Sequence, residues 1–182
     1  MRKLTALFAM IAIVLSMAVL AGCAGGGGAV KTGLGTVISI DKSKDATSEA
    51  AGAAQVDTVM AAVSVDGSGK IVSVTIDTAQ TKVAFDAAGK ITTDKAGEFK
   101  TKVEIGDAYG MKKASSIGKE WYEQIADLEK WMVGKTIEQV KAMKVTEADG
   151  SVRTAQTDLT SKVTVDVSDF IAAVEEAVKN AK

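Results

Sequence analysis

Histidine is absent from the 182 residues of this chain, and Cys23 is its single cysteine. The absence of histidine excludes a Ser-His-Asp hydrolase and a histidine-ligated zinc or haem site. The absence of a second cysteine excludes internal disulfides, cysteine-ligated clusters and dithiol redox chemistry. No cluster of oxygen ligands is distinctive enough for calcium either, so the sequence predicts no metal site.

The chain also lacks an excess of basic residues, because 22 Lys and Arg face 23 Asp and Glu. Nucleic-acid binding requires a concentrated basic face, so we expect no nucleic-acid partner. Aromatic residues make up only 4% of the chain, and its apolar residues are mainly Ala and Val. We therefore expect one domain with a thin core.

The longest apolar run lies at the N-terminus. Arg2 and Lys3 precede an uncharged stretch over residues 4–20, which ends in the sequence Leu20-Ala21-Gly22-Cys23. A short basic segment followed by an apolar run of this length is typical of a secretory signal and is short for a membrane span. The Cys23 thiol is the one side chain of this stretch that is nucleophilic enough to form a thioether.

This segment resembles the signal peptide and lipobox of bacterial lipoproteins. The resemblance implies cleavage before Cys23 and a diacylglyceryl group on its thiol, so residues 1–22 are expected to be a signal peptide. Two acyl chains anchor a protein stably, which predicts a membrane partner through the lipid and a location on the extracytoplasmic face of the cell membrane. A plain secretory signal with a chance cysteine, or a membrane-spanning anchor, are the alternatives.

Glycine is concentrated directly after Cys23. Gly25 to Gly28 form an unbroken run, and Gly33 and Gly35 follow. Such a composition behaves as flexible coil, so residues 23–35 are predicted to be a lipidated tether and residues 36–182 a single domain. A phosphate-binding loop is the alternative, but the Gly-Lys-Ser/Thr ending is missing.

Strand patterns dominate the first half of the predicted domain. Residues 36–40 form a short apolar run, and residues 56–65 and 70–76 alternate around the turn Asp66-Gly67-Ser68-Gly69. This arrangement predicts a β-hairpin. A second, shorter hairpin is expected over residues 82–85 and 90–92.

Helical patterns dominate the second half. Helices are predicted over residues 118–133, 136–143 and from Ser168 onward, and a further strand over 162–167. The inward faces are expected to carry Trp121, Ile125, Leu128 and Met132 in the first helix and Phe170, Ile171, Val174 and Val178 in the last. Strands followed by helices predict an α+β fold, in which helices pack on one face of an antiparallel sheet.

The segment Asp158-Leu159-Thr160-Ser161-Lys162-Val163-Thr164 resembles the C-terminal signature of the FMN-binding domain family, Asp-x-x-Ser-Gly-Ala-Thr. Asp158, Ser161 and Thr164 match the family's positions, whereas Lys162 and Val163 replace its glycine and alanine. The resemblance implies an FMN-binding-like fold, FMN as a possible cofactor and Thr164 as the hydroxyl that receives FMN through a phosphoester. The alternative interpretation of the same residues is an ordinary β-strand.

Other polar and aromatic residues were assigned from their spacing. Tyr122 and Trp131 lie off the apolar stripe and are candidates for a ligand pocket, whereas Trp121 is assigned to the core. The aspartates near strand ends are expected to form turns: Asp66, Asp77, Asp86 and Asp94. Glu120 and Glu123 are given no catalytic role.

Together these features predict a membrane-anchored, non-enzymatic module for binding or interaction, with a protein partner or small ligand that the sequence does not name. Two alternatives stay open: an extracellular electron-transfer flavoprotein with FMN on Thr164, and a solute-binding accessory lipoprotein.

Overall fold

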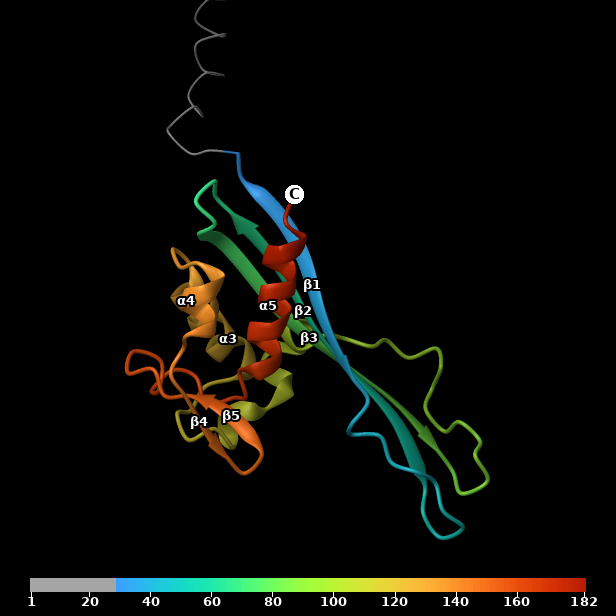
Figure 1. The fold of residues 1–182 in the computed structure, drawn as a ribbon. Helices are drawn as coiled ribbons and strands as arrows, with labels where there is room; N and C mark the ends of the chain where they lie inside the picture. The colour runs from blue at the N-terminus through green and yellow to red at the C-terminus, as the bar shows by residue number, and fades with distance from the viewer. Residues whose placement is uncertain (1–28) are drawn as a thin grey trace, which may run out of the picture.

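The computed structural model of the chain describes residues 29–182. It confirms the α+β fold, because helices cover one face of a three-stranded antiparallel sheet (Figure 1). The strands pair in the order β1-β2-β3, and their bounds are Lys31–Ser39, Gly52–Val65 and Ile71–Phe85. The predicted signal peptide and Cys23 lie outside the described residues.

The remaining elements follow the sheet in the chain. Two 3₁₀ turns, Gly106–Tyr109 and Met111–Lys113, connect the short helix α2 to the longer helix α3. A second sheet pairs β4 with β5, in a stretch for which the sequence predicted only a polar turn. The bounds are α2 Lys102–Ile105, α3 Trp121–Met132, α4 Ile137–Lys141, β4 Val145–Ala148, β5 Ser151–Thr154 and α5 Ser168–Asn180.

The predicted hairpin forms around Asp66. Its carboxylate oxygen Oδ1 accepts hydrogen bonds from the backbone N–H groups of Ser68 (2.8 Å) and Lys70 (3.0 Å), which fixes the turn. Both strands run well beyond the predicted bounds. The second predicted hairpin is reduced to one bridge between Phe85 and Ile91.

Strand register decides what lines the inner face of the sheet, which we define as the face that α3 and α5 cover. Alternate residues share a face, so successive inner rows are Gly35, Ala61 and Ile76, then Val37, Val59 and Thr78, then Ser39, Asp57 and Gln80. The inner face therefore changes from small and apolar to polar along the strands.

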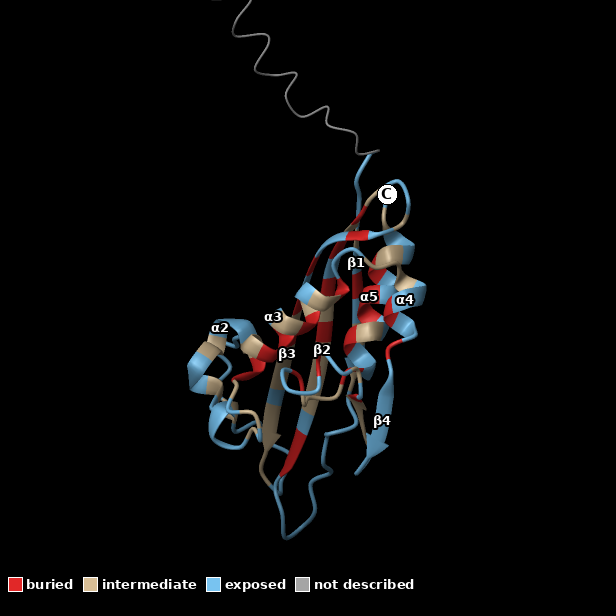
Figure 2. Ribbon diagram, turned by 90° about the vertical axis from the view of Figure 1, so that its left-hand side faces the viewer, coloured by how far each residue is buried: buried red, intermediate tan, exposed pale blue. Residues whose placement is uncertain are grey.

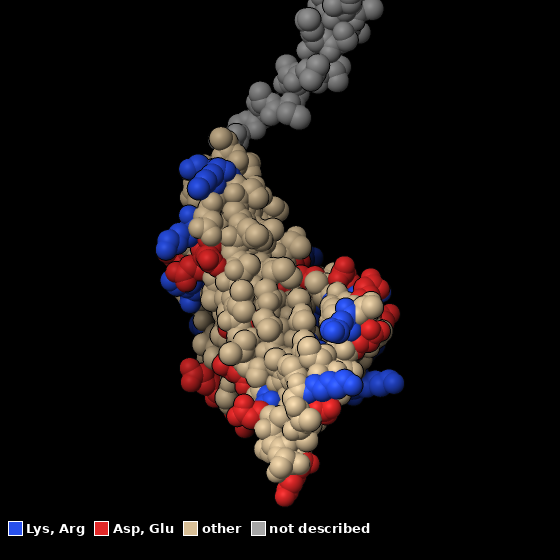
Figure 3. Space-filling view, turned by 90° about the vertical axis from the view of Figure 1, so that its right-hand side faces the viewer, with Lys and Arg blue, Asp and Glu red and all other residues tan. Residues whose placement is uncertain are grey.

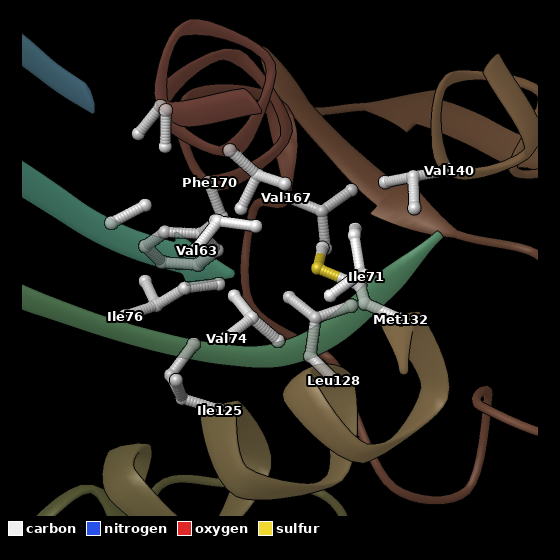
Figure 4. Close-up of a cluster of buried hydrophobic side chains, with 14 of the residues drawn as sticks. Val63, Ile71, Val74, Ile76, Ile125, Leu128, Met132, Val140, Val167 and Phe170 are labelled. Atoms are coloured by element: carbon white, nitrogen blue, oxygen red, sulfur yellow. The ribbon is translucent and has the colours of Figure 1, made fainter. Parts of the chain in front are cut away.

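The core lies between the apolar rows and the helices. The four predicted inward residues of α3 are all buried, and Figure 4 shows three of them facing β3 and α5. The Trp121 and Phe170 rings meet edge to face with centroids 5.9 Å apart. Burial of one such side chain contributes about 1.5–3 kcal/mol, so this thin core still supplies the main stabilising term.

Helix α5 lies directly on β1, and this contact corrects the predicted tether. A Cβ atom at Gly33 would lie 2.0 Å from the carbonyl oxygen of Ala177, and one at Gly35 would lie 2.1 Å from that of Ala173. These glycines therefore allow two backbones to touch. The strand begins at Lys31, so the prediction of a tether through residue 35 and a domain from residue 36 is wrong from Lys31 onward.

Both edges of the sheet have partners. On the β1 edge, the Thr36 N–H donates to Glu176 Oε2 (2.7 Å), and the Asn180 side chain donates to the Leu34 carbonyl (3.0 Å). On the β3 edge, the Ile76 N–H donates to Glu129 Oε1 (2.6 Å). Such contacts satisfy groups that would otherwise pair with another strand.

The outer face of the sheet is open. Figure 3 shows this face as a broad surface with few charges. Leu34 and Ile38 on β1 are 60% and 64% exposed. Among residues 29–182, no helix has both the length and the hydropathy required to cross a bilayer.

Residues 162–167 do not form the predicted strand. The carbonyls of Gln156 and Leu159 instead accept N–H groups in successive turns over residues 157–162, and Asp166 forms a single bridge with Arg153. Val163 and Val167 are buried in the core, so the valine alternation reflects burial. The Val167 N–H donates to the Val152 carbonyl of β5 (2.8 Å).

Candidate functional site

A cleft of about 460 Å³ opens where the inner face of the sheet becomes polar. This volume is within the range of small-molecule sites. In Figure 1 the strands β2 and β3 continue past the helices, and Figure 2 shows that the stretch of β3 beyond the helices is mostly not buried. The loop after β1, α2, the first turns of α3 and α5 and the start of β5 also line the cleft.

The polar floor is a hydrogen-bond network around Asp57. Its carboxylate is 2.6 Å from the Lys42 ammonium and accepts from the side-chain amides of Gln55 (2.8 Å) and Gln80 (3.3 Å). Burial would raise the pKa of Asp57, but these bonds outweigh it and lower the pKa. Gln80 also accepts from the Tyr109 hydroxyl (3.3 Å), which ties the floor to the loop after α2.

Lys102 brings a positive charge to the cleft. Thr101 bridges Ala79 of β3 and caps α2, which fixes the start of the helix beside the sheet. The Lys102 ammonium lies 4.9 Å from the centroid of the Tyr109 ring and 5.1 Å from that of Trp121. Burial and the neighbouring Lys42 lower its pKa to about 8, against the opposing charges of two aspartates, Asp57 and Asp77.

Thr78 supplies an unpaired polar atom. The residue is 4% exposed, and its hydroxyl has no hydrogen-bond partner among the described residues. A buried hydroxyl without a partner costs about 1–3 kcal/mol. Thr78 is one of the residues that line the cleft, so this unsatisfied group lies beside the space that a bound molecule would occupy.

The walls of the cleft are apolar. They are formed by Val59 on the sheet, Met111 in the second 3₁₀ turn, Trp121 at the start of α3, Val165 before α5 and Phe170 in its first turn. The cleft thus combines apolar walls with a polar floor, and polar groups placed against apolar surface are typical of small-molecule sites.

A second hollow adjoins the cleft and contains Thr164. The two share four lining residues, namely Met111, Ser151, Val165 and Asp166. The half-buried Thr164 donates to Oε1 of the buried Gln124 through its N–H (2.8 Å) and its hydroxyl (3.2 Å). The predicted attachment residue therefore lines a hollow that adjoins the cleft.

The structure separates the three residues that match the FMN-binding signature. Asp158 and Ser161 are exposed in the turns over residues 157–162 and line neither hollow. Thr164 alone reaches the site, so the structure does not support a binding role for Asp158 and Ser161. Cys23, the predicted lipidation site, is outside the described residues.

The surroundings of Thr164 suit a phosphoester. Arg153 and the hydroxyls of Ser115 and Ser116 line the same hollow, and these are groups that bind phosphate oxygens. The nearby Asp166 carboxylate already accepts from the Val152 and Ser168 backbones, at 2.8 and 2.9 Å.

The two departures from the signature cause no strain. Lys162 has no positive φ angle, so the backbone here does not require the family's glycine. Val163 is 1% exposed and contributes to the core, a contact that the family's alanine would make less well. Lysine and valine are therefore compatible with this turn.

Three assignments from spacing are wrong. Tyr122 and Trp131, the predicted pocket residues, line neither hollow, since the Tyr122 hydroxyl donates to Asp107 (2.9 Å) and Lys135 covers the Trp131 ring. Trp121 is a core residue that also lines the cleft. Asp77 forms no turn, because it lies within β3 and accepts from the Val103 N–H (3.2 Å).

Glu120 has a structural role that its position on a helix flank did not suggest. It is 3% exposed, and its two carboxylate oxygens accept from the N–H groups of Met111 (2.8 Å) and Lys112 (3.0 Å). Glu123 in turn accepts from the Glu120 N–H (2.8 Å). The capping-box spacing of these two glutamates was the available sequence signal.

Comparison with known proteins gives one informative match. No protein-family model matches the chain, and no solved structure matches it. The chain is similar to the chlorophenol reductase of Desulfitobacterium hafniense, with 36% identity over 81 residues, which are 44% of this chain and 25% of the relative. The match thus spans about a quarter of that relative's length. Because a reductase is an enzyme, this finding contradicts our prediction that the chain is not an enzyme.

Proposed function

We propose that this chain is a redox protein of the extracytoplasmic membrane face, anchored by a lipid on Cys23, that carries FMN on Thr164. The observation that carries the proposal is the position of Thr164 in a hollow that Arg153 also lines and that adjoins the aromatic-lined cleft. The partial match to a reductase supports a redox role.

Different residues would bind different parts of the cofactor. Thr164 is the attachment point, and Gln124 fixes its backbone through the 2.8 Å hydrogen bond. Arg153 and the neighbouring serines would neutralise the phosphate. The apolar walls of the adjoining cleft would surround the ring and exclude water from it.

FMN would supply one- or two-electron transfer, which the side chains of this chain cannot perform. The protein's contribution is position and electrostatics. The charged groups of the cleft include the pair Lys42 and Asp57 and the Lys102 ammonium over two rings, and Asp41, Asp166 and Asp169 also line it. The reductase activity of the relative is thus consistent with a role for this chain in delivering electrons or in reducing an aromatic substrate.

The test is the intact mass and the visible spectrum of the protein purified from its native host. We expect the lipid on Cys23, the added mass of a flavin phosphate and a yellow protein. Thr164→Ala should be colourless and lose the flavin mass, whereas Thr160→Ala, an exposed threonine of the neighbouring turn, should retain both. A colourless wild-type chain without the flavin mass would refute the flavin assignment.

Anchoring is tested separately. Cys23→Ser should release the chain from washed membranes and remove incorporation of labelled fatty acid. Equal membrane retention of the variant and the parent would contradict the lipid anchor without bearing on the flavin.

A further inference from the structure

We propose that Lys102 and Thr78 form a binding site for a ring oxygen, either a phenolate or a ring carbonyl, of a planar aromatic ligand in the cleft. The inference uses the cleft of the proposed function and specifies the ligand class that it recognises. The oxygen-bearing edge of a flavin ring and a free phenolate share this chemistry, and the experiments below distinguish them.

The first observation is a cation without an ionic partner. Among residues 29–182, no carboxylate oxygen lies within 4.0 Å of the Lys102 ammonium, whereas Lys42 in the same cleft is paired with Asp57. Lys102 is instead held over the faces of the Tyr109 and Trp121 rings. Cation–π contacts contribute about 0.5–2 kcal/mol, and they leave the ammonium protons available to an oxygen acceptor.

The acidic residues near Lys102 have other partners or lie at the rim. Asp57 accepts from Lys42 and two amides, and Asp166 accepts from the N–H groups of Val152 in β5 and Ser168 at the start of α5. Asp77 accepts from the N–H groups of Thr78 (2.7 Å) and Val103. The exposed Asp41 and Asp169 border the cleft where solvent screens them.

The second observation is the unpaired hydroxyl of Thr78, which is almost completely buried and lines the same cleft as Lys102. A threonine at this inner-row position breaks an apolar face that otherwise continues through Val37 and Val59. A ligand oxygen that accepts from this hydroxyl would remove the cost of leaving it unsatisfied.

The third observation is the shape of the remaining surface. Trp121, Phe170 and Met111 form apolar walls, and aromatic and thioether groups pack well against a flat ring. The cleft therefore has an ammonium and a hydroxyl among its lining groups, together with apolar walls for a ring.

The test uses the full-length chain in detergent, made in a host without a flavin transferase. Trp131→Phe leaves Trp121 as the single tryptophan, so its fluorescence reports on the cleft. Titration with para-nitrophenolate should quench this fluorescence saturably. Nitrobenzene, which has the nitro group but lacks the phenolate oxygen, should bind at least ten times more weakly.

Variants then assign the two donors. A hydrogen bond to a charged group contributes about 1.5–3 kcal/mol, so Lys102→Gln should weaken para-nitrophenolate binding about 10- to 100-fold and leave nitrobenzene nearly unchanged. Thr78→Val should weaken it several-fold. Lys113→Gln, an exposed lysine outside the cleft, is the matched control and should have no effect. Absence of saturable binding, or equal affinity in Lys102→Gln and the control, would overturn the proposal.

Two further experiments distinguish a flavin ring oxygen from the oxygen of a free phenolate. If the ring oxygen belongs to flavin, free lumiflavin should displace para-nitrophenolate competitively, and Lys102→Gln should lower the reduction potential of the yellow native protein. If it belongs to a free phenolate, lumiflavin should not compete. Lys102-dependent binding in a chain that carries no flavin when purified from its native host would uphold this site while the flavin assignment fails.

Discussion

The two ends of the inner face of the sheet are built from the same three strands but serve opposite purposes. Under α5 and α3 the rows are small and apolar, and Gly35, Ala61 and Ile76 allow the helices to approach closely. Two rows further along, Ser39, Asp57 and Gln80 meet a cleft in place of a helix.

We call the part of the sheet around the row Gly35, Ala61 and Ile76 the packed half, and the part around the row Ser39, Asp57 and Gln80 the cleft half. The difference between them indicates where the chain has lower stability in favour of function. In the packed half, that row carries only glycine and apolar side chains, as expected for a core. In the cleft half, within residues 29–182, Lys102 has no ionic partner and the Thr78 hydroxyl has no hydrogen bond. Locally unfavourable groups of this kind cluster at functional sites.

The largest expected loss of stability comes from a substitution at Gly35, in the packed half. Gly35→Ala would place a methyl group against the α5 backbone, 2.1 Å from the Ala173 oxygen, where neither backbone can move without loss of the core. We expect the free energy of unfolding to fall by about 3 kcal/mol or more, measured by urea denaturation. Leu34→Ala, on the open face of the same strand, is the control and should cost about 0.5 kcal/mol. Equal losses would show that α5 does not lie against β1.

The position of Met111 in the wall of the cleft should depend on the buried carboxylate of Glu120. In Glu120→Gln only one of the two side-chain atoms can accept a hydrogen bond, so either Met111 or Lys112 would face an amide N–H. We expect a loss of about 2 kcal/mol, together with weaker ligand binding because Met111 lines the cleft. Glu123→Gln retains its single acceptor by rotation and should lose only a few tenths of a kcal/mol. Similar losses in both variants would contradict this assignment.

The cleft half should respond to pH in a way that the packed half does not. Burial lowers the pKa of Lys102 to about 8 from its ordinary value of 10.5, so the unfolded chain binds more protons between these values. Stability should therefore rise with pH from about 8 to 10, by roughly 1–2 kcal/mol after allowance for solvent screening.

Above pH 10 the raised pKa of Tyr109 acts in the opposite direction. The measurement is urea denaturation at a series of pH values, and Lys102→Met should remove the slope between pH 8 and 10. A slope that is unchanged in this variant would show that another group titrates.

The packed half was largely predictable from the sequence, and the cleft half was not. The α3 stripe of Trp121, Ile125, Leu128 and Met132 and the turn at Asp66 depend on local spacing, which the sequence displays directly. The role of Gly33 and Gly35 was missed because a glycine-rich stretch after a signal segment is also typical of a flexible linker. Only the approach of α5, distant in the sequence, shows that their missing side chains matter.

The cleft residues were missed for a related reason. Lys102 and Thr78 have no distinctive neighbours in the sequence, and their importance arises from the bridge between Thr101 and Ala79. Thr164 was predicted from its resemblance to a signature, and the structure places it in the hollow that adjoins the cleft. Tyr122 and Trp131 were favoured because they lie off the apolar stripe of α3, but such positions can equally contact solvent or a neighbouring loop.

The sharpest test of the comparison is a substitution that should make the protein more stable. Thr78→Val replaces the unpaired hydroxyl with a methyl group of similar size, in a row whose other members are valines. Removal of a buried group that has a hydrogen-bond partner lowers the free energy of unfolding. Here no partner exists among the described residues, so we expect the free energy of unfolding to rise by about 1 kcal/mol, measured by thermal or urea denaturation without ligand. The same variant should bind para-nitrophenolate less well, and a fall in stability instead would mean that the hydroxyl is already satisfied within the fold.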